Sequence, residues 1–319
     1  MDLLFKYINV FRKLKRAYQG GGAPHKPILL LAVLDCIKQG KIQTSKIYIS
    51  PELILCFKEL WIKLVKTPHR LNFALPFYHM HTEPFWKLIC KPGIQIELTT
   101  SKSIKSLSSL DNSLLYAELD IDLFHLMSNS LTNELLRLDL LKFYFNETSN
   151  ISADFSLFNT IENQILNDDK LEYTSRIMEL TSSLSNDEIE EEIFVRGRMF
   201  KREVPKIYNY TCSISRMKLQ VETNAQMVDA CHIIPFSFSK DDTIKNGICL
   251  SPNLHRAFDR GIISISNNYR VSVSKKIVED KSPFNLKQFD GIEILIPTNS
   301  NYKPSIENFD WHRENKFIE

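Results

Sequence analysis

The 319-residue sequence lacks the long apolar runs of a membrane protein. Its longest such run, residues 27–34, ends at Asp35 and is far shorter than the roughly 20 residues that span a bilayer. No signal peptide is evident, because basic residues interrupt the amphipathic amino terminus. Internal repeats and low-complexity tracts are also missing. These absences predict a soluble, cytoplasmic protein without a membrane partner.

The sequence also has few cysteines and no close cysteine pair. None of its six cysteines belongs to a Cys-x-x-Cys motif, and each one stands in an apolar context. This pattern excludes a disulfide framework and a structural zinc knuckle. It predicts reduced thiols in the core of a cytosolic protein.

The chain does contain a strong division of charge, which its formal net charge of +2 hides. Residues 1–92 hold 15 Lys and Arg against 5 Asp and Glu, and residues 193–319 hold 19 against 14. Between them, residues 93–192 hold 6 against 19. Because Lys and Arg contact phosphates, both basic segments are candidate DNA surfaces. The alternative is that they only solvate helix faces.

Four chemically capable residues follow one another in the carboxy-terminal segment: His232, Asn246, His255 and Asp259, at intervals of 14, 9 and 4 residues. His232 follows a strand-like run, and Asn246 is expected to open the turn after a second strand. His255 and Asp259 follow Pro252 in a helical pattern, so their spacing places both side chains on one helix face.

These residue types suit phosphodiester hydrolysis, which needs a proton acceptor, a cation and rigid placement of both. His232 is the candidate general base, because an imidazole can accept a proton near neutral pH. His255 and Asp259 can hold a divalent ion, with Mg²⁺ or Mn²⁺ expected and Co²⁺, Ni²⁺ or Zn²⁺ tolerated. The amide of Asn246 can hold the base-bearing loop. The alternative is that His255 and Asp259 are an ordinary solvated pair.

This order and spacing resembles the HNH endonuclease family, in which two short strands and one helix grip a divalent ion. The similarity extends over about residues 195–319 and includes a helix with Arg196, Phe200 and Arg202. It implies that His232, Asn246 and His255 are the catalytic residues. Exposed arginines beside the metal ligands are candidate DNA contacts, namely Arg256 and Arg260.

The chain departs from the family pattern at Cys231, where many HNH enzymes carry an aspartate or histidine as a further metal ligand. A thiol would be an unusual ligand for Mg²⁺, so Cys231 is interpreted as a packing residue. Asp229 is then a third-ligand candidate. Strand alternation argues against it, because residues 229 and 232 are expected to point to opposite faces.

The first 92 residues resemble the sulfur-binding domain of phosphorothioate-dependent type IV restriction endonucleases. The resemblance is carried by the segment 24–27 before a Leu-rich helix, by the turn at 76–78 and by a strand at Phe85-Trp86. It implies a shallow apolar pocket that receives the sulfur of a modified phosphate. Sulfur is larger and less hydrated than oxygen, so such a pocket penalises an ordinary phosphate through desolvation.

The resemblance assigns candidate DNA-binding residues to this domain. The expected pocket wall is Pro76, Phe77 and Tyr78. The expected phosphate or base contacts are His25, Lys26, Arg70 and His79. The alternative for the proline and the aromatic residues is ordinary core packing.

Together these observations predict an α+β protein. We expect a mostly helical DNA-recognition domain with a small sheet at 1–145, an acidic helical connector at 146–194 and a ββα-metal nuclease domain at 195–319. Within the first domain, residues 114–145 are expected to be helical.

The predicted function is divalent-metal-dependent cleavage of double-stranded DNA by a modification-dependent restriction enzyme. Cleavage of both strands by one such site favours a homodimer. Two alternatives stay open: a type II restriction enzyme that reads unmodified bases, and a DNA-binding defence or regulatory protein that does not cleave.

Overall fold

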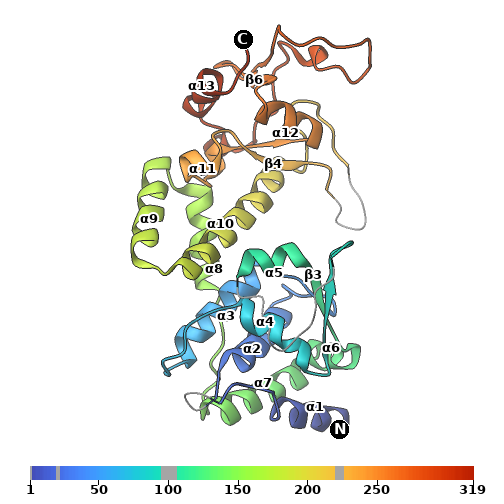
Figure 1. The fold of residues 1–319 in the computed structure, drawn as a ribbon, viewed down its shortest axis with the longest axis vertical. Helices are drawn as coiled ribbons and strands as arrows, with labels where there is room; N and C mark the ends of the chain where they lie inside the picture. The colour runs from blue at the N-terminus through green and yellow to red at the C-terminus, as the bar shows by residue number, and fades with distance from the viewer. Residues whose placement is uncertain (1, 19–21, 95–105, 220–225) are drawn as a thin grey trace. The chain divides into compact units, whose positions relative to one another are not determined.

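The structure is a computed structural model that describes residues 2–18, 22–94, 106–219 and 226–319 (Figure 1). It combines helices with small antiparallel sheets, so the predicted α+β class is confirmed. The chain divides into two compact units. The first comprises Met1–Thr160 with Leu184–Val195, and the second comprises Ile161–Ser183 with Arg196–Glu319. No helix among the described residues is long and apolar enough to cross a membrane.

The first unit is built mainly from helices around a buried central helix, α2. All but two of its fourteen residues are buried. α3 packs beside it, and its start is fixed by the Ser50 side chain, which caps the helix, and by Pro51 in the first turn. The helices of this unit are α1 (Asp2–Phe11), α2 (His25–Lys38), α3 (Pro51–Leu64), α4 (Ala74–His79), α5 (Leu107–Ser113), α6 (Ile121–Ser128) and α7 (Ser130–Phe145).

A three-stranded antiparallel sheet completes the first unit, in the order β1 (Lys46–Ile47), β3 (Leu114–Leu119), β2 (Trp86–Cys90). The predicted strand at Phe85-Trp86 is confirmed by β2. The prediction that residues 114–145 are helical throughout is wrong for β3. A short apolar run fits a strand or a helix equally well, and here pairing with both neighbouring strands decides the outcome.

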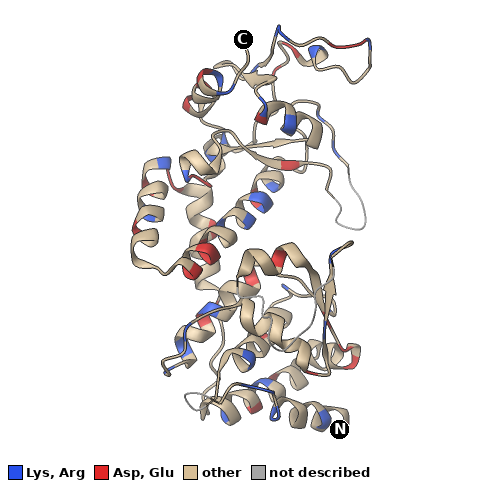
Figure 2. Ribbon diagram, in the orientation of Figure 1, with Lys and Arg blue, Asp and Glu red and all other residues tan. Residues whose placement is uncertain are grey.

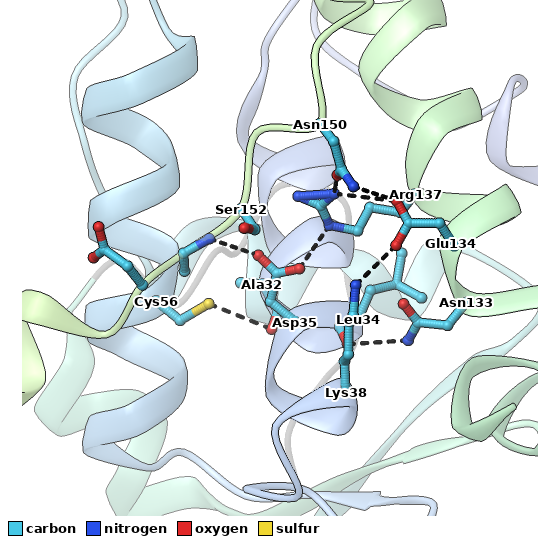
Figure 3. A network of polar contacts seen from close by, with 12 residues as sticks. Ala32, Leu34, Asp35, Lys38, Cys56, Asn133, Glu134, Arg137, Asn150 and Ser152 are labelled. Carbon is cyan, nitrogen blue, oxygen red and sulfur yellow. Dashed lines mark hydrogen bonds and ion pairs between the residues drawn. The ribbon is translucent and has the colours of Figure 1, made fainter. Parts of the chain in front are cut away.

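A buried ion pair ties α2 to α7 in this unit (Figure 3). The Arg137 guanidinium is fully buried, and its Nε donates to Asp35 Oδ1 at 2.7 Å. The other carboxylate oxygen of Asp35 accepts from the Ala153 backbone N–H at 2.8 Å. Burial raises the pKa of Asp35, and the charge of Arg137 opposes that rise. The pair therefore joins two helices and the chain that follows them.

Residues 146–194 are largely helical, as predicted, and form α8 (Ser156–Asn167), α9 (Lys170–Ser183) and the start of α10 (Asn186–Ile207). Acidic residues open α10 and basic residues follow, as Figure 2 shows. Not all of the acidic side chains at the start of α10 are exposed to solvent, because Glu191 and Glu192 are buried. Burial raises the pKa of Glu191 to about 7, whereas Glu192 pairs with Lys58 at 3.3 Å.

The second unit contains the predicted nuclease elements. β4 (Asp229–His232) pairs antiparallel with β5 (Gly247–Leu250), and α12 (Pro252–Asp259) follows at once. The later part of α10 packs Phe200 and Val204 into the same core as β4, β5 and α12. The remaining elements are α11 (Phe236–Ser239), β6 (Ile263–Ile265), β7 (Val271–Val273) and α13 (Ile306–Asn315).

α13 closes this unit through a buried histidine. His312 stacks on Phe258 with ring centroids 3.8 Å apart, and its Nε2 donates to the Phe258 carbonyl at 3.0 Å. Burial lowers the pKa of His312 to about 4, which keeps the ring neutral and structural at neutral pH. The backbone at Lys316 passes close to Gly261. A Cβ at position 261, whose φ is +66°, would lie 1.8 Å from the Lys316 carbonyl oxygen, so the glycine makes this close approach possible.

We expect Arg137→Ala to lower the free energy of unfolding by about 3–5 kcal/mol, because the buried Asp35 carboxylate would lose its ion partner. Urea denaturation measures this loss. The matched control is Lys38→Ala, which removes a more exposed pair with Glu134 (side chains 41% and 26% exposed) and should cost less than about 1 kcal/mol. Equal losses in the two variants would contradict the prediction.

Candidate active site

His232 stands at the end of β4, as predicted, and two neighbours hold its ring. Its Nε2 lies 2.8 Å from Asp242 Oδ1, and Phe200 stacks on it with centroids 3.9 Å apart and planes at 11°. Gly247, directly opposite His232 in the ladder, leaves room for Phe200. A Cβ on Gly247 would lie 2.6 Å from Val204 and 3.0 Å from Phe200.

The Asn246 side chain stabilises the loop that follows His232 through hydrogen bonds to its backbone. Its fully buried amide Nδ2 donates to the carbonyls of Ile234 and Asp241, and its Oδ1 accepts from Ile234 N–H, all at 2.9 Å. The positioning role expected of Asn246 therefore agrees with its contacts. Its expected location does not, because it ends a short 3₁₀ turn before β5 and does not open a turn after a strand.

His255, the fourth of the eight residues of α12, lies between two carboxylates. Its Nε2 is 3.4 Å from Asp259 Oδ2, four residues along the same helix. Its Nδ1 is 3.3 Å from Asp229 Oδ2 on β4. Asp229 and His232 have different partners, as strand alternation predicts, and the Asp229 carboxylate approaches His255. His232 instead faces Phe200 and Asp242.

The residues beside β4 fit a divalent cation. Ligand atoms of Cys231, His255 and Asp259 all lie within 4.8 Å of one another. The carboxylates of Asp229 and Asp259 are about half exposed, which leaves room for water or phosphate oxygens. Imidazole and carboxylate donors of this kind suit Mg²⁺ or Mn²⁺.

Cys231 is the weakest donor in this group. The side chain is fully buried, and its Sγ lies 3.9 Å from Asp259 Oδ1. Burial, reinforced by the charges of Asp259 and Asp229, raises the pKa of Cys231 well above its usual value. A thiol is an unusual ligand for a hard cation such as Mg²⁺, and the full burial of this side chain is consistent with the packing interpretation of Cys231.

Asp229 and Asp259 approach different nitrogens of the same imidazole, which separates their roles. A cation held by His255 Nε2 and Asp259 leaves Nδ1–H to donate to Asp229. Such a carboxylate fixes the orientation of a metal-binding histidine from outside the coordination sphere. The geometry thus favours Asp259 as the ligand and Asp229 as the residue that orients His255.

The sequence alone assigned no chemical role to two residues that the structure places beside His232. Asp242 is buried against His232, and Phe200 stacks on the same ring. The only sequence signal for Asp242 is an acidic pair in the loop between His232 and Asn246. The two candidate DNA contacts Arg256 and Arg260 are exposed at the carboxyl end of α12.

In the first unit, a groove of about 1030 Å³ brings together four of the predicted DNA-binding residues. Its walls include His25, Lys26, Pro76 and His79. Three other predicted residues do not line it. Phe77 and Tyr78 are fully buried in the core, and the carbonyl oxygen of Arg70 accepts a hydrogen bond from His25 at 2.9 Å.

The groove is bordered by a basic segment whose role the sequence did not reveal. The predicted amphipathic stretch from the amino terminus stays helical only to Phe11, and residues 12–18 then run along the groove. None of the described lining residues is acidic. Lys26 is not available to an anion, because its Nζ pairs with Glu83 and donates to Thr82 at 2.8 Å. The guanidinium of Arg12 also pairs with a carboxylate, that of Asp139. The other cationic or imidazole lining residues are Lys13, Lys15, Arg16, His25, His69 and His79.

Comparison with known proteins agrees with the geometry of the second unit. Residues 212–266, which include β4, β5 and α12, match the HNH endonuclease family, so the chain carries an HNH endonuclease domain. The family match does not reach residues 1–145, and the sulfur-binding resemblance stays a prediction. No curated protein matches the chain.

One solved structure that resembles the chain is described as a modification-dependent TagI restriction endonuclease. The likeness has 19% sequence identity and a TM-score of 0.28, and it covers 38% of this chain and 38% of that one.

We expect His255→Ala and Asp259→Ala to abolish measurable Mn²⁺ binding in isothermal titration calorimetry, since each removes a ligand. Asp229→Ala should weaken binding by about 10–100-fold, as is typical for loss of an orienting carboxylate. Asp290→Ala, an exposed carboxylate elsewhere in the second unit, serves as the control and should not change the affinity. Complete loss of binding in Asp229→Ala would instead make Asp229 a ligand.

Proposed function

We propose that the protein is a divalent-metal-dependent endonuclease that hydrolyses phosphodiester bonds of double-stranded DNA. The observation that carries the proposal is the arrangement around β4. A histidine with a fixed ring lies at the end of this strand, and an imidazole-carboxylate pair on α12 packs against it. The HNH family match over the same elements supports this interpretation.

Each residue has a distinct task in the proposed mechanism. His232 accepts a proton from the attacking water. Asn246 holds the loop after His232 and so keeps the base in place. His255 and Asp259 would hold the divalent ion, which when bound supplies positive charge that stabilises the phosphate transition state and the leaving oxygen. Arg256 on α12 and Arg260 directly after it are exposed, which supports a role for both in binding flanking phosphates.

We further propose that the first unit reads DNA through its basic groove. The groove has cationic residues at 12–16 and imidazoles at 25, 69 and 79, with apolar contributions from Leu75 and Pro76. Cations attract the backbone, and an apolar wall favours a weakly hydrated group such as the sulfur of a phosphorothioate. These features support a modification-dependent restriction enzyme. Cutting both strands with one site per chain would then require a homodimer.

We expect His232→Ala to reduce Mn²⁺-dependent plasmid cleavage by about 10²–10⁴-fold, the usual range for loss of a general base. DNA affinity, measured by fluorescence anisotropy, should stay nearly unchanged because the proposed task of His232 is proton transfer and not phosphate binding. If the wild-type protein binds DNA but does not cleave with Mg²⁺, Mn²⁺, Co²⁺ or Ni²⁺, it is a binding protein and the nuclease proposal fails.

Charge reversal in the groove tests the DNA-reading proposal. Lys13→Glu with Lys15→Glu should weaken binding to every duplex and reduce the salt dependence of the affinity, because two phosphate contacts are removed. Lys66→Glu, an exposed lysine of the same unit outside the groove lining, is the control and should have little effect.

A panel of phosphorothioated, methylated and unmodified plasmids tests what the wild-type enzyme recognises. We expect phosphorothioated DNA to be cleaved preferentially. Equal cleavage of all three would identify an enzyme that reads unmodified bases and would refute modification dependence.

A further inference from the structure

The loop between His232 and Asn246 places a buried carboxylate against the proposed base. Asp242 is 1% exposed, and its Oδ1 lies 2.8 Å from His232 Nε2. Its neighbour Asp241 has a different task, because the Asp241 carboxylate accepts from the Thr243 backbone N–H at 2.8 Å. Of this acidic pair, Asp242 contacts the histidine.

Loop stability alone does not account for a carboxylate at position 242. A buried charge is unfavourable unless hydrogen bonds or an opposite charge compensate it. Among the described residues, the second oxygen of Asp242 has no hydrogen-bond partner. The contact with His232 is therefore the interaction that explains why a buried acid stands at this position.

The contact also determines where the proton of His232 resides. An ionised carboxylate can only accept hydrogen bonds, so Nε2 must be the donor and must carry the proton. Phe200 lies nearly parallel against one face of the ring at 3.9 Å, which opposes rotation of the imidazole. The Nδ1 lone pair is then left to act as the proton acceptor.

We propose that Asp242 is the positioning residue of His232, a proposal that depends on the nuclease function proposed above. Asp242 holds the Nε2–H tautomer while Nδ1 takes a proton from water, whose oxygen bonds to phosphorus as the bond to the 3′ oxygen breaks. The 3′ oxygen receives a proton from solvent, and His232 later releases its extra proton to solvent. While His232 is an imidazolium, the Asp242 carboxylate stabilises its charge, as in other histidine-carboxylate pairs.

The first test is Asp242→Asn in the full-length protein. The amide can donate to Nε2 and so favours the opposite tautomer, which should lower kcat for Mn²⁺-dependent plasmid cleavage by about 10²–10⁴-fold. KM and Mn²⁺ affinity should not change, because Asp242 contacts neither substrate nor the proposed ligands. The matched control is Glu203→Gln, which alters a buried acid paired with Arg202 and Lys206 and should leave kcat unchanged.

A second measurement uses the wild-type protein directly and needs a variant only for resonance assignment. ¹⁵N NMR of histidine-labelled wild-type protein, with the His232 resonances assigned through His232→Gln, should show a proton on Nε2 and none on Nδ1. A proton on Nδ1 would overturn the proposal.

The outcomes separate this proposal from the one on which it depends. Absence of cleavage by the wild-type protein would overturn both. If the wild-type protein and Asp242→Asn cleave equally while His232→Ala is inactive, the nuclease function stands and the role of Asp242 is refuted. Loss of kcat together with loss of Mn²⁺ binding would also refute it, because that result indicates a structural role.

Discussion

The proposed active site depends on the hydrogen bonds that Asn246 makes inside the loop between β4 and β5. A single buried amide satisfies two carbonyls and one N–H, two of them on Ile234, the second residue after the proposed base. Buried backbone groups need such partners, so the loop has one favoured conformation. That conformation brings Asp242 back to His232 and leads the chain into β5, from which α12 follows.

The two histidines of the site share a principle but serve different purposes. Each imidazole has a nitrogen within hydrogen-bond distance of a carboxylate, which favours the tautomer with its proton on that nitrogen. For His232 the carboxylate is Asp242, and the free nitrogen can accept a proton. For His255 the orienting carboxylate is Asp229, and the other nitrogen faces Asp259 and the proposed cation. Both roles follow from an acceptor-only group placed within hydrogen-bond distance.

The local parts of both units could be predicted from sequence alone. Ser50 and Pro51 mark the start of α3, and the spacing of His255 and Asp259 predicts a shared helix face. Predictions failed where long-range contacts decide the outcome. Residues 114–119 form a strand because β1 and β2 pair with them. Local patterns do not carry information about such partners.

The sequence by itself determined the kinds of groups present: a base candidate, a clamp and an imidazole-carboxylate pair, at spacings typical of HNH nucleases. Only the tertiary structure decided which carboxylate meets which nitrogen. It brings Asp242 to His232 and Asp229 to His255, and it gathers residues 12–16 with His69 and His79 around one groove. The physical reason is that a hydrogen bond depends on distance and direction in space, and residues far apart in sequence acquire these only when the chain packs.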